Sequence, residues 1–107
     1  MSRIERINDL LRSELSRQMI NNISLDNGLI TITRVKCSPN LQSATVYISV
    51  LPENQAGTAL KIIRKNNRQF SAQFEKLNLK NIPKLIWRID PVARHAAEID
   101  RAFNDLA

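Results

Sequence analysis

Two β-rich runs separated by a short turn constrain the fold of this chain more than any other feature. Residues 29–37 and 41–51 each alternate in polarity, which is the period of a strand. The residues between them, Ser-Pro-Asn, are turn formers, so the sequence predicts an antiparallel hairpin. In the first strand, we expect one face to carry Ile30 and Ile32 and the other to carry Thr31, Thr33, Val35 and Cys37. In the second strand, we expect one face to carry Ala44, Val46, Ile48 and Val50.

An amphipathic helix is predicted before the hairpin, over about residues 2–19. Ser2 and Glu5 form the capping box that satisfies free N–H groups at a helix start. A second helix is predicted from about Asn54, after Pro52 ends the second strand. The apolar stripes of the two helices are Ile4, Ile7, Leu11, Leu15 and Met19, and then Ala56, Ala59, Leu60 and Ile63.

The rest of the chain predicts a broken helix, a third strand and a final helix. Asn66-Asn67 interrupts the helical period before it resumes at Phe70, and Asn favours a kink because it is a poor interior helix residue that tolerates a left-handed backbone. A third strand covers Leu85 to Ile89, and Asp90-Pro91 starts a last helix to Leu106. We therefore expect an α+β sandwich, with helices on one face of a three-stranded sheet whose second and third strands can pair in parallel.

Length and composition indicate one small globular domain, residues 1–107. The apolar runs are too short for a membrane span, and the charged N-terminus lacks the apolar core of a signal peptide. The single cysteine, Cys37, cannot form an internal disulfide and is expected as a buried strand residue. These features favour a cytoplasmic protein, which we expect to be a monomer.

Catalytic patterns are missing from the sequence. The only histidine, His95, has no second histidine or neighbouring cysteine with which to share a metal ion. No Gly-x-Ser-x-Gly elbow or phosphate loop is present, and the carboxylates are scattered. We therefore expect no enzymatic activity, no cofactor and no metal site.

Positive charge is concentrated in residues 61–88, which hold eight Lys or Arg and one acid, Glu75. Such a field suits a polyanion, although charge alone does not choose among nucleic acid, an acidic membrane surface and an acidic protein. Phe70, Phe74 and Trp87 are expected in the core, which favours recognition of an RNA backbone over stacking. The candidate RNA-binding residues are Lys61, Arg64, Lys65, Asn66, Asn67, Arg68, Lys76, Lys80, Lys84 and Arg88, with Arg3, Arg6 and Arg17 as an extension on the first helix.

Two segments resemble a known family. Residues 35–50 read Val-Lys-Cys-Ser-Pro-Asn-Leu-Gln-Ser-Ala-Thr-Val-Tyr-Ile-Ser-Val, which is similar to the second-strand signature of bacterial ribosome-binding factor A. The stretch from Ile82 through Pro83 and Leu85 to Asp90 resembles that family's Pro-x-Leu strand. At the helix break the family usually has Ala-x-Gly, whereas this chain has Lys-Asn-Asn.

The resemblance implies a type II KH-like fold of order α-β-β-α-kink-α-β with an added C-terminal helix. It also implies a ribosome assembly factor that binds the small ribosomal subunit and its rRNA during late maturation and rRNA processing, together with other assembly factors. Two alternatives are open from the residues alone: a KH-like RNA-binding module without a ribosomal role, and a basic adaptor for an acidic protein.

Overall fold

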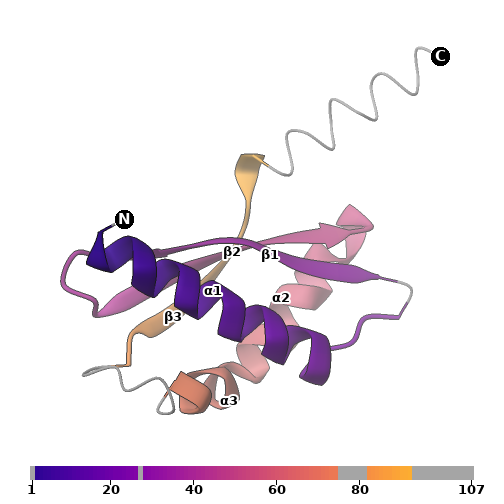
Figure 1. The fold of residues 1–107 in the computed structure, drawn as a ribbon. Helices are drawn as coiled ribbons and strands as arrows, with labels where there is room; N and C mark the ends of the chain where they lie inside the picture. The colour runs from indigo at the N-terminus through magenta and orange to yellow at the C-terminus, as the bar shows by residue number, and fades with distance from the viewer. Residues whose placement is uncertain (1, 27, 75–81, 93–107) are drawn as a thin grey trace.

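The predicted hairpin forms two strands of a three-stranded sheet in the computed structural model, which describes residues 2–26, 28–74 and 82–92. The predicted C-terminal helix lies outside the described residues beyond Val92, as does His95; at its predicted cap, Asp90 Oδ1 accepts a hydrogen bond from the Val92 backbone N–H at 2.9 Å. Figure 1 shows the elements in chain order: α1 (Arg3–Asn22), β1 (Leu29–Cys37), β2 (Ser43–Leu51), a 3-10 turn η1 (Glu53–Gln55), α2 (Ala56–Lys65), α3 (Asn67–Ala72) and β3 (Lys84–Ile89).

The sheet has the order β1-β2-β3, with β1 and β2 antiparallel and β2 and β3 parallel. The parallel pairing confirms the crossover through two helices. The start of β2 differs from the prediction, because Leu41 belongs to the turn. Its backbone N–H donates to the Ser38 carbonyl at 2.9 Å, its φ is 59°, and the strand begins at Ser43.

The faces predicted for β1 are wrong beyond Ile32. The register with β2 shifts between Ile32 and Arg34, so Thr33 is the extra residue of a β-bulge. Val35 is consequently buried on the same side as Ile32, and Arg34 faces outward opposite Tyr47. The Thr33 hydroxyl lies within hydrogen-bonding distance of the Tyr47 carbonyl oxygen and of Asp90 Oδ2, which ties the bulge to the end of β3.

Helix α1 begins at the predicted cap. The Ser2 hydroxyl accepts a hydrogen bond from the Glu5 backbone N–H at 3.1 Å. Leu11, Leu15 and Met19 are buried, so the predicted stripe is confirmed. Because the spacing of these residues places them on one side of the helix, α1 packs along the inner face of the sheet, mainly on β1.

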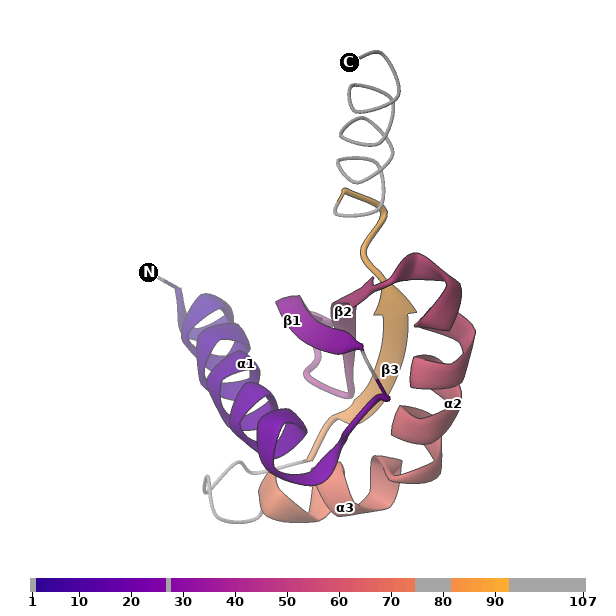
Figure 2. The same cartoon turned by 90° about the vertical axis from the view of Figure 1, so that its right-hand side faces the viewer.

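The three α-helices of the described residues cover one face of the sheet, as predicted. Figure 2 shows α1 and α2 over opposite edges, with α3 lying between them. Helix α2 packs mainly on β2 and β3. Every buried apolar residue of the strands belongs to this inner face, whereas the other face mixes polar and charged side chains with exposed or half-buried apolar ones such as Leu51 and Ile86.

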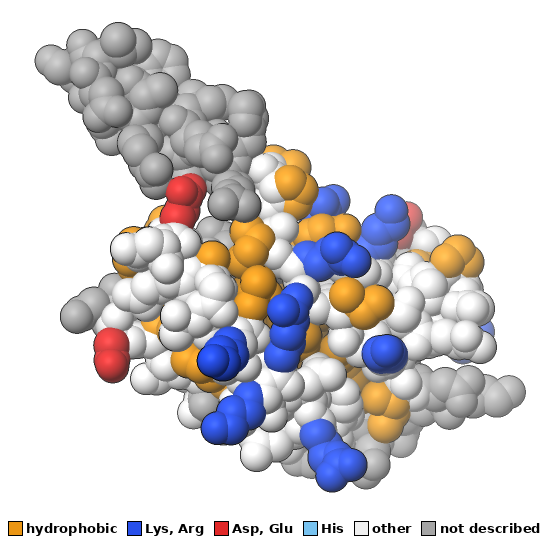
Figure 3. All heavy atoms as spheres, turned by 180° about the vertical axis from the view of Figure 1, so that it is seen from behind, with side chains coloured by type: hydrophobic (Ala, Val, Ile, Leu, Met, Phe, Trp, Pro, Cys, Tyr) orange, Lys and Arg blue, Asp and Glu red, His pale blue; other side chains and the backbone are white. Residues whose placement is uncertain are grey.

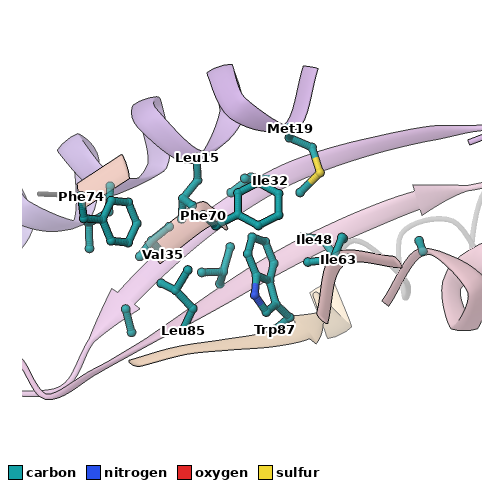
Figure 4. Close-up of a cluster of buried hydrophobic side chains, with 14 of the residues drawn as sticks. Leu15, Met19, Ile32, Val35, Ile48, Ile63, Phe70, Phe74, Leu85 and Trp87 are labelled. Carbon is teal, nitrogen blue, oxygen red and sulfur yellow. The ribbon is translucent and has the colours of Figure 1, made fainter. Parts of the chain in front are cut away.

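An aromatic pair fills the core beneath α3. Phe70 and Trp87 lie with ring centroids 5.2 Å apart and planes tilted by 53°. Figure 4 shows both rings among side chains from α1 and all three strands. Trp87 is 2% exposed and Phe74 is fully buried, which confirms that these aromatic residues belong to the core.

The only cysteine, Cys37, is buried at the end of β1, and burial raises the pKa of its thiol. Because the thiolate is the reactive form, both burial and the raised pKa slow its chemistry. We expect a maleimide to label the native protein at pH 7.5 on the order of a hundredfold more slowly than the protein in 8 M urea. Native and unfolded labelling rates within a few-fold of each other would contradict the burial of Cys37.

Candidate nucleic-acid interface

The cations of α2 and α3 form the first part of the candidate site. Lys61, Arg64, Lys65 and Arg68 are exposed, and no ion pair joins them to a carboxylate of the described residues. The sequence itself has no acid between Glu53 and Glu75. Figure 3 shows the face opposite α1, where Lys and Arg side chains gather around the middle. We call the four residues Lys61, Arg64, Lys65 and Arg68 the helical cations.

The helix ends where the sequence predicted a break, but by a different conformation. Asn66 has φ −99° and ψ 11°, a bridge-region backbone and not a left-handed one. Its backbone N–H donates to the Ile62 and Ile63 carbonyls, and its side-chain Nδ2 donates to the Ile62 carbonyl at 2.8 Å. The chain then turns into α3, so Arg68 does not continue the row that Lys61 and Lys65 form on α2 (Figure 2).

The amides of the break are engaged within the protein. Asn67 Oδ1 accepts a hydrogen bond of 2.9 Å from Trp87 Nε1, and the Asn66 amide closes the last turn of α2. Sequence analysis assigned both side chains to RNA. In the structure the Asn67 side chain joins the break to β3, whereas the Asn66 side chain bonds within α2.

Lys84 and Arg88 lie on the outer face of the sheet, because the alternating Leu85 and Trp87 are buried on the inner face. They are therefore separated from the helical cations by the edge of β3. Arg64 connects the two sides, since one guanidinium nitrogen donates to the Trp87 carbonyl at 3.2 Å. The basic surface thus bends around this edge instead of forming one flat face.

Two exposed cations of β1 escaped the sequence analysis, Arg34 and Lys36. The bulge turns both to the outer face, where the register places Arg34 opposite Tyr47 and Lys36 opposite Thr45. The Arg34 guanidinium stacks 4.0 Å from the centre of the Tyr47 ring and lies 3.8 Å from Asp90 Oδ2. Strict alternation along β1, without the bulge, would place Arg34 and Lys36 on the same face as Ile32, so the sequence alone does not reveal this arrangement.

The arginines of α1 are not brought together with the helical cations. Arg3 and Arg6 are exposed on α1, which lies over the opposite edge of the sheet (Figure 2). Arg17 pairs with Glu14, and the hydrogen bond between them raises the arginine pKa. Lys76 and Lys80 lie outside the described residues.

Other kinds of site find no support in the described part of the chain. None of its helices has the length and apolar character needed to cross a bilayer. Among the same residues, His, Cys, Asp and Glu side chains form no group able to hold a metal ion.

Comparison with known proteins places the chain in a family. A relative from Magnetococcus marinus, named ribosome-binding factor A, is 31% identical over 108 residues, spanning 97% of this chain and 88% of its own. The crystal structure of ribosome-binding factor A from Thermus thermophilus matches with a TM-score of 0.70 at 19% identity, covering 82% of this chain and 97% of that one.

A homology model of the Thermus thermophilus factor, fitted into the cryo-EM map of a 30S complex with that protein, matches with a TM-score of 0.62 at 18% identity and covers 76% of this chain and 88% of that one. At these identities the two structural matches establish the shared fold. The family model described as Ribosome-binding factor A matches residues 3–103. The chain therefore belongs to the ribosome-binding factor A family.

Proposed function

We propose that this chain is an assembly factor that binds the small ribosomal subunit through its rRNA during late maturation and rRNA processing. Membership of the ribosome-binding factor A family supports this role, as does the 30S complex into which a related fold has been fitted. The observation that assigns this role to particular residues is the basic surface around β3, formed by the helical cations, Lys84 and Arg88. None of these cations pairs with a carboxylate of the described residues.

The proposed contact is electrostatic and non-covalent. Lysine and arginine side chains neutralise phosphates and release the counterions condensed on RNA, so affinity depends steeply on salt and little on base sequence. The helical cations, Lys84 and Arg88 supply this contact on the two sides of the β3 edge, with Lys76 and Lys80 between them in sequence. Arg3 and Arg6 on α1 would reach a second part of the rRNA, because they lie over the other edge of the sheet (Figure 2).

The mechanism we infer is steric: the bound factor, a cytoplasmic monomer, holds an immature rRNA conformation until other assembly factors release it. No covalent step is needed, and none of the described residues forms a metal-binding group. The bend of the basic surface suits this role, since a bent surface can contact two rRNA segments at once.

Co-sedimentation with purified ribosomal subunits tests the proposal. We expect the chain to pellet with small subunits and not with large subunits at low salt, and to dissociate as salt rises. Equal binding to free RNA and to both subunits would instead identify a general RNA-binding module. Partners that are retained after nuclease treatment of a lysate, without small subunits, would identify a protein adaptor.

A further inference from the structure

Tyr47 occupies the middle of a row of side chains on the outer face of the sheet. The register pairs it with Arg34 on β1 and with Arg88 on β3. Arg34 stacks on the ring at 4.0 Å, an arrangement that holds the ring in place by cation–π attraction. Tyr47, whose strand neighbours in the register are two arginines, lies on the outer face and so has no role in the core, which lies on the other face.

A shallow hollow of about 550 Å³ opens beside this ring. It bends round the edge of β3, because its walls come from both sides of the sheet and from α2. Arg34 is not part of its lining, so the hollow meets a part of Tyr47 that Arg34 leaves uncovered. The lining includes Tyr47, Leu60, Arg64, Arg88, Ile89 and Pro91.

The lining combines the groups that a nucleotide needs. Tyrosine stacks on a base with little preference among bases, and guanidinium groups bind phosphate oxygens through paired N–H donors. Arg64 donates one hydrogen bond to the Trp87 carbonyl, which fixes the guanidinium at the rim and leaves further donors for a ligand. Among the described residues, no Asp or Glu lines the hollow.

We propose that this hollow binds one unpaired RNA nucleotide, with the base stacked on Tyr47 and the adjoining phosphate held by Arg64 and Arg88. The proposal rests on the RNA-binding function above and adds a preference for single-stranded RNA. A base in a duplex is stacked and paired inside the helix, so it cannot reach the ring.

Tyr47 is the only tyrosine in the chain, so its ring signals in NMR report on the hollow alone. We expect a five-nucleotide oligoadenylate to shift these signals upfield, and a blunt RNA duplex to leave them in place. Tyr47→Leu should bind oligoadenylate roughly ten- to a hundredfold more weakly, the range for loss of one stacked base. Tyr47→Phe keeps the ring and should bind as the wild type does.

Arg88→Gln should weaken oligoadenylate binding, and the matched Arg12→Gln on α1, also at an exposed arginine, should not. Far-UV circular dichroism checks that each variant is folded. If Tyr47→Leu does not fold, the shift of the Tyr47 ring signals in the wild-type protein still tests the proposal. Unmoved ring signals at saturating oligoadenylate, or an equal shift with the duplex, would overturn the inference. If the wild-type chain still pellets with small subunits in that case, only the hollow is refuted, whereas a ring shift without subunit binding refutes the ribosomal role instead.

Discussion

Small-subunit binding should fall on the order of a hundredfold when Lys61, Lys65 and Arg68 are all replaced by Gln. Each of these exposed cations is expected to neutralise one rRNA phosphate, and each lost contact lowers the slope of log affinity against log salt by about one. The slope should therefore decrease by about two to three. Binding measured by co-sedimentation over a range of salt concentrations gives both quantities.

The triple substitution should leave the fold intact. The three side chains are exposed and pair with no described carboxylate, and surface changes of this kind usually alter the free energy of unfolding by about 0.5 kcal/mol or less. A urea titration followed by circular dichroism checks this. Unchanged affinity and salt dependence in a folded triple variant would contradict the placement of the rRNA contact on α2 and α3.

A charge-matched pair of variants separates local contact from total charge. Replacing Lys61 and Lys65 by Gln lowers the net charge by two, and so does the single change Arg12→Glu on α1. Long-range attraction would weaken both variants alike. A direct contact on α2 predicts that the Lys61 and Lys65 variant loses far more affinity than Arg12→Glu.

The hairpin, the broken helix and the third strand were all predictable from period and turn chemistry. The end of β2 and the end of α2 follow from local rules, because Pro52 and the two Asn residues interrupt regular patterns within a few positions. The parallel pairing of β2 and β3 was also accessible, since two helices separate them. The family motifs then supplied what no local rule gives, which is the prediction of a ribosomal role.

The features that were missed depend on residues far apart in the chain. The bulge at Thr33 is held by Asp90, 57 positions later, and Asn67 bonds to Trp87, 20 positions later. The outward direction of Arg88 could have been predicted from its alternation with Trp87. The outward direction of Arg34 could not, because the bulge at Thr33 reverses which residues of β1 face outward beyond it. Sequence analysis therefore found most of the cations and misjudged which faces they share.

Trp87→Ala should lower the free energy of unfolding by about 3–5 kcal/mol, the usual loss for a large buried aromatic residue. The indole packs on Phe70 at 5.2 Å between ring centroids and donates to Asn67 at 2.9 Å, so one side chain connects β3 to the helix break. Small domains have about 5–15 kcal/mol of stability in total. Urea unfolding followed by circular dichroism measures the change without the lost tryptophan signal.

A double-mutant cycle isolates the hydrogen bond at the break from the packing. Asn67→Ala should cost about 1–3 kcal/mol, because it leaves the buried indole N–H without a partner. Trp87→Phe removes that N–H, so adding Asn67→Ala to it should cost much less. Equal costs of Asn67→Ala in both backgrounds would show that the bond contributes nothing. Arg64 bonds to the main-chain carbonyl of residue 87, which Trp87→Phe keeps, so a folded Trp87→Phe variant should retain its small-subunit affinity.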